Sequence, residues 1–478
     1  MKNYSHPKAL PYLFLTEMWE RFGFYVVQGL LVLFMTESLG FSDDVSYVIL
    51  GVFTALVYTS NIAGGFLADR VLGFKLSIVW GGLFLILGYA MLALPIKTLF
   101  YPALATIIVG NGLFKPNISS LLGTQYSIDD PRRDSGFTIF YIGINIGSFL
   151  AGLSSGYIRE LIGWHTSFAL ASLGLVIGLI TFAFGLRTIK EDPTRSLNLR
   201  HHRFLTKPWV FLYCILLIFF LSRFLSSEIL KHYLLPGLGI LLVIFLIVLT
   251  LRQQPQFRKR LFLLNILIMS SVVFWMMFFQ IFFSANLFVE RLVNKNWLGF
   301  HMPSTMFYAA ESIFIIVLGP FFAWFWGMLS NKNLNPSAFT KFALGIMFAG
   351  LGFVALGCST FFPDVNFMVN PLWVIFAYLL ITIGELLLSP IGLSAVTTHA
   401  PPHLIGLMMG VWFVGTGFGG IFAGLLAQMA SVPETMTAPL MKLTVYQHAF
   451  FNYAYIAFAV AFILFFVKWL FKKKLQRG

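Results

Sequence analysis

Long apolar runs recur from one end of the chain to the other, separated by short polar stretches. Each run is roughly 18–25 residues long, which is the length that an α-helix needs to cross about 30 Å of hydrocarbon. The predicted fold class is therefore an all-α membrane protein with 14 transmembrane helices. We expect these spans at residues 13–36, 46–68, 76–96, 101–124, 137–158, 166–186, 208–226, 234–251, 261–288, 305–329, 338–362, 371–395, 404–430 and 448–470.

Two basic linkers, at residues 187–207 and 252–260, divide these spans into groups of six, two and six. This order predicts an N-terminal six-helix bundle at 1–186, the linkers with two additional helices at 187–260, and a C-terminal six-helix bundle with a basic cytoplasmic tail at 261–478. Two such bundles resemble the plan of major facilitator transporters. The loops are short, so a catalytic domain has no room outside the membrane and we do not expect an enzyme.

Composition agrees with a lipid environment, because 58% of the residues are hydrophobic and only 10% are charged. The net charge of +14 could indicate nucleic-acid binding, but its distribution argues against that function. If both termini are cytoplasmic, most Lys and Arg residues lie inside, as the positive-inside rule requires. They are those of the two linkers and the tail together with Lys2, Lys8, Arg70, Lys75, Arg132, Arg133, Lys332 and Lys341. The smaller set outside comprises Lys97, Arg159, Lys231, Arg291, Lys295 and Lys442.

Ionisable residues inside the apolar runs are the strongest functional signal. A charge in hydrocarbon costs several kcal/mol unless it faces a polar interior, so each such residue is a candidate functional site. On the first span, Glu17, Glu20 and Arg21 share a helical face with Tyr25, and we expect Glu17 to pair with Arg21 and to leave Glu20 available. The full set is Glu17, Glu20, Arg21, Lys115, Glu311 and Glu385.

Five segments carry a family resemblance, in order and with the same spacing from about residue 17 to residue 424. They are EMWERFGFY (17–25), GGFLADRVLGFK (64–75, followed by a glycine pair at 81–82), GLFKPN (112–117), FTIFYIGINIGSF (137–149) and GELLLSPIGL (384–393). By these motifs the chain resembles the proton-dependent oligopeptide transporter family, bacterial type. The resemblance implies symport of di- and tripeptides with protons into the cell by alternating access, across the cytoplasmic membrane of a bacterium.

The same resemblance implies residue roles. Arg21 and Lys115 would face the carboxylate of the peptide, and Asn145 and Glu385 its amino group. Glu17, Glu20 and Arg21 would form the proton-coupling group, and Glu311 is placed in both the coupling and the substrate sets. The full substrate-binding set is Arg21, Tyr25, Tyr58, Lys115, Asn145, Glu311, Glu385 and Trp412. We expect no cofactor and no metal, and a protein that works as a monomer in the lipid bilayer.

Four positions depart from the family pattern. Phe24 stands where many members have tyrosine, Gln28 where many have arginine, and Phe279 where many have glutamate. Losing the last two charges together avoids leaving one of them buried without a partner. Glu311, followed by Ser312, stands where the family usually has asparagine near the amino-group pocket.

Other functions fit the sequence less well. A proton-coupled transporter of another small solute, such as an amino acid, a diamine, nitrate or a drug-like compound, is the main alternative. An intramembrane enzyme would need a catalytic group, yet His301, His399, His403 and His448 lack metal-ligand spacing. A channel would need a filter-like loop repeat, which the sequence does not contain.

Overall fold

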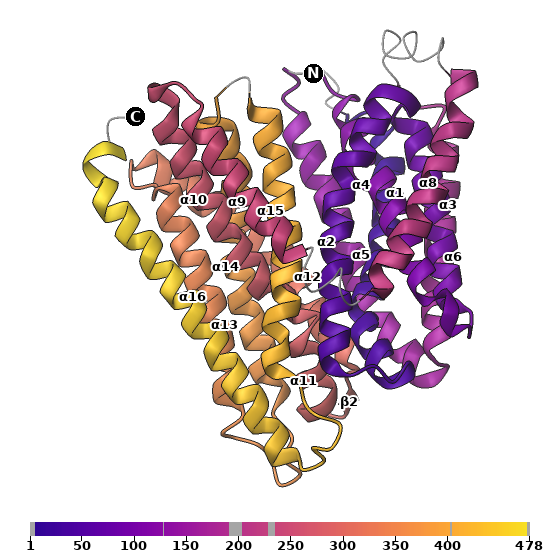
Figure 1. Ribbon diagram of the computed structural model, residues 1–478, viewed down its shortest axis with the longest axis vertical. Coiled ribbons are helices and arrows are strands. Elements are labelled where there is room, and N and C mark those ends of the chain that lie inside the picture. Colours follow the sequence, from indigo (N-terminus) through magenta and orange to yellow (C-terminus); the bar gives the residue numbers. More distant parts are fainter. Residues whose placement is uncertain (1–4, 128, 191–202, 228–234, 402–403, 476–478) are drawn as a thin grey trace. The chain divides into compact units, whose positions relative to one another are not determined.

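The computed structural model describes residues 5–127, 129–190, 203–227, 235–401 and 404–475 (Figure 1). Within these residues the all-α fold with fourteen long helices is confirmed, and twelve helices are long and apolar enough to cross a membrane. The first six long helices are α1 (Leu10–Leu33), α2 (Asp43–Leu67), α3 (Phe74–Ala93), α4 (Phe100–Gly123), α5 (Arg133–Leu161) and α6 (Trp164–Gly185). Most of the predicted linker at 187–207 lies outside the described residues, as do Lys231 and His403.

The remaining long helices follow in the same order as the predicted spans. They are α8 (Arg203–Ser226), α9 (Leu235–Leu251), α10 (Pro255–Phe278), α12 (Ser304–Asn331), α13 (Ala338–Ser359), α14 (Pro371–His399), α15 (Ile405–Ala427) and α16 (Pro439–Leu475). Most of the predicted second linker forms the first turns of α10, because Pro255 is favourable at the start of a helix.

The chain forms two compact units. Unit 1 comprises Met1–Leu31 and Leu56–Leu230, and unit 2 comprises Val32–Ala55 and Lys231–Gly478. The end of α1 and the first half of α2 therefore pack with the C-terminal helices of unit 2.

Unit 1 is built by close helix packing at small residues. The α3 helix packs against α4 and α6, and α8 lies on α4. Where α2 crosses α4, the backbones approach so closely that a Cβ atom on Gly64 would lie 1.7 Å from the carbonyl oxygen of Gly112. Asn117 stabilises the crossing, since its Nδ2 donates to the Gly64 oxygen at 3.3 Å. Such small-residue contacts replace the hydrophobic driving force that is missing between helices in lipid.

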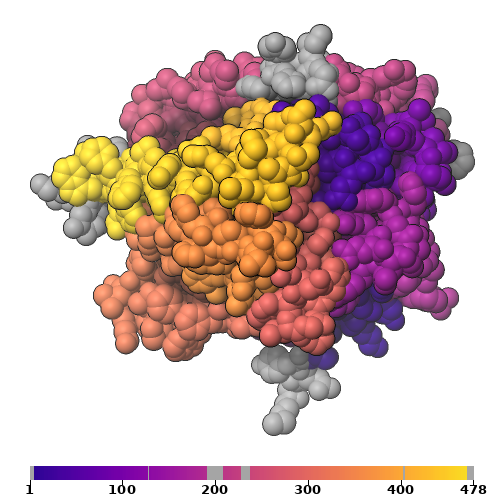
Figure 2. Space-filling view, turned by 90° about the horizontal axis from the view of Figure 1, so that it is seen from below, coloured from indigo at the N-terminus to yellow at the C-terminus, as the bar shows by residue number. Residues whose placement is uncertain are grey.

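In unit 2, α13 packs along α14 and α16, and their orange and yellow surfaces are adjacent in Figure 2. The first turn of α2 is fixed in this unit by charge. Arg291 donates from its two terminal nitrogens to the Asp43 carboxylate at 2.7 and 2.8 Å, and the Val432 amide donates to Asp43 at 3.0 Å. A bidentate pair of this kind sets orientation as well as charge balance.

The predicted span at 261–288 is not one continuous helix, which corrects the sequence interpretation. The α10 helix ends at Phe278, a single 3₁₀ turn follows at Phe279–Ile281, and the short α11 runs from Ser284 to Leu292. Backbone groups at the break are bonded within the turn, since the Phe282 and Phe283 amides donate to the Phe279 and Gln280 oxygens at 2.9 and 3.1 Å. The Gln280 side chain ties the turn to its surroundings, because its Nε2 donates to the Ala423 oxygen on α15 at 2.9 Å while its Oε1 accepts from Ser284 at 2.6 Å.

A small β-hairpin, which the hydrophobic pattern did not predict, follows α11. Its strands are β1 (Asn296–Trp297) and β2 (Phe300–His301). The two turn residues, Leu298 and Gly299, both have positive φ angles, 51° and 82°, as a two-residue hairpin turn requires.

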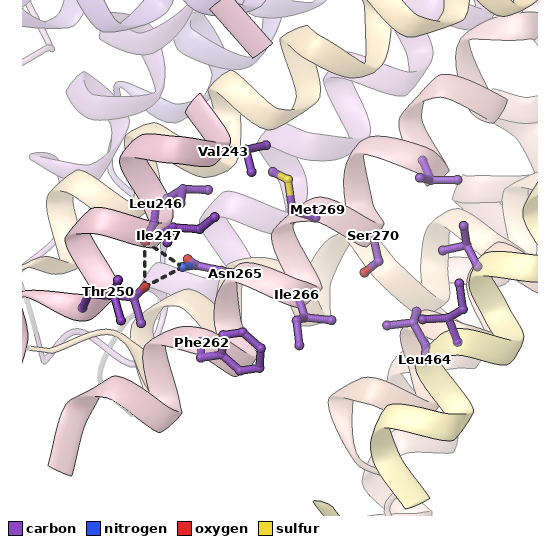
Figure 3. A pocket seen from close by; sticks show the side chains of 14 residues that line it. Val243, Leu246, Ile247, Thr250, Phe262, Asn265, Ile266, Met269, Ser270 and Leu464 are labelled. Carbon is purple, nitrogen blue, oxygen red and sulfur yellow. Dashed lines mark hydrogen bonds between the residues drawn. The ribbon is translucent and has the colours of Figure 1, made fainter. Parts of the chain in front are cut away.

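A cavity of about 500 Å³ lies between α9, α10 and α16 in unit 2 (Figure 3). Its lining is mostly apolar and contains no charged residue. The Nδ2 of Asn265 donates to Thr250 Oγ1 at 2.8 Å, while the Asn265 Oδ1 is buried without a partner among the described residues. A cavity lined by apolar side chains with no charged group suits hydrocarbon chains rather than a zwitterion.

The α2–α4 crossing generates a stability prediction. Gly64→Ala should lower the free energy of unfolding by about 1–3 kcal/mol or more, because its Cβ would meet backbone rather than a movable side chain. Gly65→Ala is the matched control, since the nearest atom to its Cβ is Pro116 Cβ at 3.9 Å. Thermal unfolding of the purified variants in detergent measures the difference. Equal stability of the two variants would contradict the packing argument.

Candidate functional site

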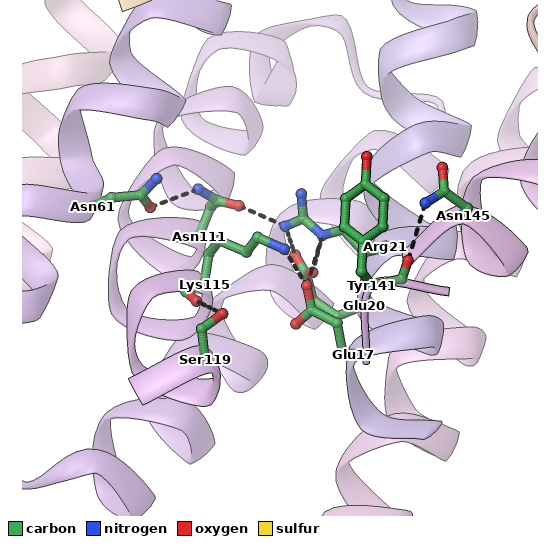
Figure 4. Close-up of polar contacts among 9 residues, drawn as sticks. All are labelled: Glu17, Glu20, Arg21, Asn61, Asn111, Lys115, Ser119, Tyr141 and Asn145. Carbon is green, nitrogen blue, oxygen red and sulfur yellow. Dashed lines mark hydrogen bonds and ion pairs between the residues drawn. The ribbon is translucent and has the colours of Figure 1, made fainter. Parts of the chain in front are cut away.

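Four charged side chains from two helices meet inside unit 1 (Figure 4). Glu17, Glu20 and Arg21 lie on α1, and Lys115 lies on α4. Glu17 and Glu20 are completely buried and Arg21 is 7% exposed. The two cations and two carboxylates balance, which is the condition for keeping charges in an apolar interior.

Arg21 is the centre of this cluster. Its Nε and Nη2 both donate to the Glu20 carboxylate, and Nη2 also donates to Asn111 Oδ1 at 3.0 Å. The guanidinium carbon lies 4.7 Å from the centre of the Phe24 ring. Phe24, one of the departures from the family pattern, thus offers an aromatic face to a cation where tyrosine would also offer a hydroxyl group.

Lys115 binds the other carboxylate, because its ammonium group donates to Glu17 Oε1. The Lys115 side chain is 24% exposed, so it is the most accessible of the four charges. Glu17 Oε2 is buried and has no hydrogen-bond partner among the described residues. One carboxylate oxygen and the remaining ammonium hydrogens are therefore available to other groups.

The ion pair between Glu17 and Arg21 that helical spacing predicted is present, with 3.6 Å between Glu17 Oε1 and Arg21 Nε, but the closer partner of Glu17 is Lys115. Glu20 is not left available, since it is bound by Arg21. The guanidinium group reaches the adjacent residue because the arginine side chain is long enough to fold back along the helix.

Two asparagines complete the cluster, and the sequence interpretation did not include them. Asn111 Nδ2 donates to the Val57 oxygen at 3.1 Å and to Asn61 Oδ1 at 3.2 Å, which turns its own carbonyl oxygen toward Arg21. The spacing in the sequence could have indicated that Asn111 belongs to the cluster. Asn111 precedes Lys115 by four residues, so both lie on one face of α4.

The other predicted residues of unit 1 lie near this cluster or along the same helices. Tyr25 lies close enough to Arg21 to interact electrostatically with it, and Tyr58 is half-buried on α2. Asn145 is buried on α5, where its Nδ2 donates to the Tyr141 oxygen at 3.0 Å. Gly147 brings α5 against α1, because a Cβ there would lie 2.3 Å from the Met18 oxygen.

Unit 2 contains the second group of buried charges. Glu311 on α12 and Glu385 on α14 are 7% and 8% exposed, and these two helices pack against each other. Ser312 Oγ donates to Glu311 Oε2 at 3.4 Å. The two carboxyl groups that the sequence placed in one region are therefore both buried, on two helices that pack against each other.

Two further predicted positions of unit 2 are packed in its core. The Trp412 ring fills the space beside Gly392 on α14, where an added Cβ would lie 1.8 Å from it. Phe279 is 2% exposed and packs against Trp275 and Phe278, so no charge occupies this position.

Among the described residues, no group of three or more His, Cys, Asp and Glu side chains could hold a metal ion. What the two clusters can do is bind opposite charges. The cations of unit 1 can accept an anionic group, and the carboxyl pair of unit 2 can accept a cation or a proton.

The unit 1 cluster predicts a stability effect that does not depend on function. Lys115→Met should lower the free energy of unfolding by up to about 5 kcal/mol, because it leaves Glu17 buried with an uncompensated charge. The double variant Glu17→Gln/Lys115→Met removes both charges and should recover most of that loss. Thermal or denaturant unfolding of both variants measures it. A double variant no more stable than Lys115→Met would show that the pair is not coupled.

Comparison with known proteins identifies the family. The profile of the POT family matches residues 75–446. Dipeptide and tripeptide permease B of Salmonella typhimurium is 32% identical over 98% of this chain and 96% of its own length. Peptide transporter YePEPT of Yersinia enterocolitica is 34% identical over 88% of each chain.

Solved structures agree with these relatives. The peptide transporter POT, crystallised in complex with sulfate, matches 98% of this chain and 95% of its own with a TM-score of 0.83 and 29% identity. Tetrameric PepTSo2 matches 97% and 98% with a TM-score of 0.85 and 29% identity. This chain belongs to the POT family of membrane transporters, and it is not an enzyme.

Proposed function

We propose that this protein imports di- and tripeptides together with protons across the cytoplasmic membrane of a bacterium, by alternating access. The observation that carries this proposal is the pair of cations inside unit 1, buried Arg21 and partly buried Lys115, in a family whose relatives are named for peptide transport. Buried cations that keep spare donors replace the water that a peptide carboxylate loses on entering the membrane.

We assign the peptide carboxylate to Arg21 and Lys115. The Lys115 ammonium group uses one of its hydrogens in the bond to Glu17, and no bond to Nη1 of Arg21 is present among the described residues. Both side chains can therefore donate to a carboxylate without losing the partners that hold them. Charge-assisted bonds from two cations would fix the orientation of the substrate as well as bind it.

We assign the amino group of the peptide to Glu385, a buried carboxyl group that pairs with no cation among the described residues. Tyr25, Tyr58, Asn145 and Trp412 complete the proposed substrate-binding set with Glu311. The tightly packed ring of Trp412 would contribute by shaping the pocket rather than by offering a polar group.

We assign proton coupling to Glu17, Glu20 and Arg21, with Glu311 as a further member. Glu20 accepts two bonds from Arg21, so a proton on Glu20 would weaken the hold on this guanidinium group. Glu17 Oε2 is buried without a donor and could take up a proton directly. In both cases protonation leaves the cluster with excess positive charge, which favours binding of an anion.

Three further assignments belong to this proposal. Both termini would lie in the cytoplasm, as the distribution of Lys and Arg predicts. Residues 1–186, 187–260 and 261–478 would act as two bundles with an inserted helix pair. The functional unit would be a monomer, although the related PepTSo2 has been crystallised as a tetramer.

Transport of a different small solute is the second candidate function. The buried carboxyl pair in unit 2 would suit a diamine or an amino acid as well as a peptide, because each carries an ammonium group. Competition by these compounds against a labelled dipeptide separates the candidates.

Uptake into proteoliposomes tests the proposed function. Labelled dialanine should accumulate when the inside is alkaline and negative, and should only equilibrate without the gradient. Dialanine with an amidated C-terminus should compete at least about tenfold less well, because it lacks the charge that Arg21 and Lys115 bind. Equal competition by the amide would show that no carboxylate is recognised, and absence of dialanine uptake would reject the peptide substrate.

Glu20→Gln tests the coupling assignment. It should abolish accumulation against a gradient but keep counterflow exchange of dialanine, because glutamine still accepts a bond from Arg21 but cannot take up a proton. Counterflow in the same preparation controls for folding. Normal accumulation by Glu20→Gln would move the coupling role to another residue.

A further inference from the structure

The cavity between α9, α10 and α16 in unit 2 is open on the side of these helices. Ile247 on α9, Phe262 on α10 and Ile463 on α16 all line it, and all three are also exposed on the outer surface. Within the described part of α9, only Leu246 and Thr250 are buried. The outer surface of membrane-spanning helices faces hydrocarbon, so an acyl chain can enter this cavity from the bilayer.

The length of the cavity matches the depth of one leaflet. Its lining runs from Val243 to Leu251 on α9 and from Phe262 to Val273 on α10. At a rise of 1.5 Å per residue these segments are about 12 and 16 Å long. Half of the hydrocarbon core is about 15 Å. Figure 3 shows Phe262 at one end and Val243 at the other, so a chain can lie along the helices.

Positive charge gathers at one end of the cavity, where α9 leads into α10. Arg258 is exposed and lies four residues before Phe262, which places it on the face of α10 that lines the cavity. Its Nε donates to the Gln253 oxygen at 2.7 Å, which holds the guanidinium group beside the connection between the helices. No Asp or Glu occurs from residue 235 to residue 289. The cations of this segment are Arg252, Arg258, Lys259 and Arg260.

The start of α10 adds to this positive charge. Gln254, the residue that precedes the helix, makes no side-chain bond to its first turn, and that turn contains no acidic residue. The N-terminus of a helix carries a partial positive charge that a carboxylate or a phosphate stabilises. Here the described helix supplies no carboxylate of its own, so an anion from outside would meet both the helix end and the arginines.

The interior of the cavity offers no donors to an anion. The hydroxyl groups of Thr250 and Ser270 donate to the Leu246 and Leu267 oxygens, each at 2.8 Å. Asn265 Nδ2 donates to Thr250 Oγ1 at 2.8 Å and to the Leu246 oxygen at 3.4 Å, and its buried Oδ1 is an acceptor. A phosphate group needs donors or cations, so it belongs at the basic end and only the hydrocarbon part of a ligand belongs inside.

We propose that this cavity binds one acyl chain of an anionic phospholipid whose phosphate group lies at Arg252 and Arg258. Basic side chains at a membrane surface attract anionic lipids, and the apolar lining stabilises the chain. A zwitterionic lipid would bring its own cation to the basic end and bind less tightly. None of these residues belongs to the proposed substrate or coupling sets, so the lipid site is independent of the proposed function.

Native mass spectrometry of the purified full-length protein measures the binding of the first lipid. Phosphatidylglycerol should bind more tightly than phosphatidylcholine with the same acyl chains. The double variant Arg252→Gln/Arg258→Gln should weaken phosphatidylglycerol binding by up to about 25-fold, at about fivefold for each arginine, and leave phosphatidylcholine binding unchanged. Arg187→Gln, which removes an exposed arginine just after α6 in unit 1, is the matched control and should change neither.

Filling the cavity tests the position of the acyl chain. Val243 and Val248 lie on the same helix and are 41% and 40% exposed, but only Val243 lines the cavity. Val243→Trp should therefore weaken the binding of both lipids, whereas Val248→Trp should bind them like the wild type. Met269→Trp fills the same cavity from α10 and should repeat the loss, which guards against a fault in one variant.

Three results would overturn the proposal. Equal affinity of the wild type for the two lipids, or unchanged phosphatidylglycerol binding in the double arginine variant, would reject the headgroup site. Unchanged binding in both Val243→Trp and Met269→Trp would reject the cavity as the place of the chain. The same loss in Val248→Trp as in Val243→Trp would show a general effect of tryptophan on the helix surface and reject it equally.

Discussion

Neutralising buried charge is the constraint on which the rest of this structure depends. The α1 and α4 helices carry four ionised groups into an apolar unit, and each is tolerable only because its partner lies in contact with it. Unit 2 differs, because its two buried carboxyl groups, Glu311 and Glu385, form no ion pair among the described residues. The ion pairs of unit 1 hold their side chains in place, whereas the carboxyl groups of unit 2 can still accept a cation or a proton.

Helix packing sets the distances between the charged side chains and their partners. The Gly64–Gly112 crossing places α4 directly against α2, and the Gly147 contact places α5 against α1 at Arg21 itself. A side chain at Gly64 or Gly147 would meet backbone atoms of the neighbouring helix, so the helices would have to move apart. The glycines in the family motifs therefore position the charged residues in addition to allowing the helices to pack closely.

The sequence predicted the helices and the charged positions because both follow from the cost of placing groups in lipid. It could not predict which charges pair. Helical periodicity assigns Glu17 and Arg21 to one face, but it does not say that Lys115 arrives from another helix and takes Glu17. It likewise gave no account of the break at Phe279–Ile281, where the Gln280 side chain binds a helix more than 140 residues later. Asn111 was missed for a related reason, since its role exists only where α2 and α4 meet.

The charged cluster of unit 1 and the buried carboxyl groups of unit 2 together suggest why a zwitterion is the appropriate substrate. A proton taken up by Glu17 or Glu20 leaves the unit 1 cluster one positive charge in excess, and a carboxylate removes that excess. An ammonium group arriving near Glu385 brings a positive charge to a buried carboxyl group that pairs with no cation among the described residues. A substrate carrying both groups thus brings a group of opposite charge to each unit, whereas a substrate carrying only one leaves the other unit without that partner. Coupling between proton and substrate then follows from the charge balance of the unit 1 cluster.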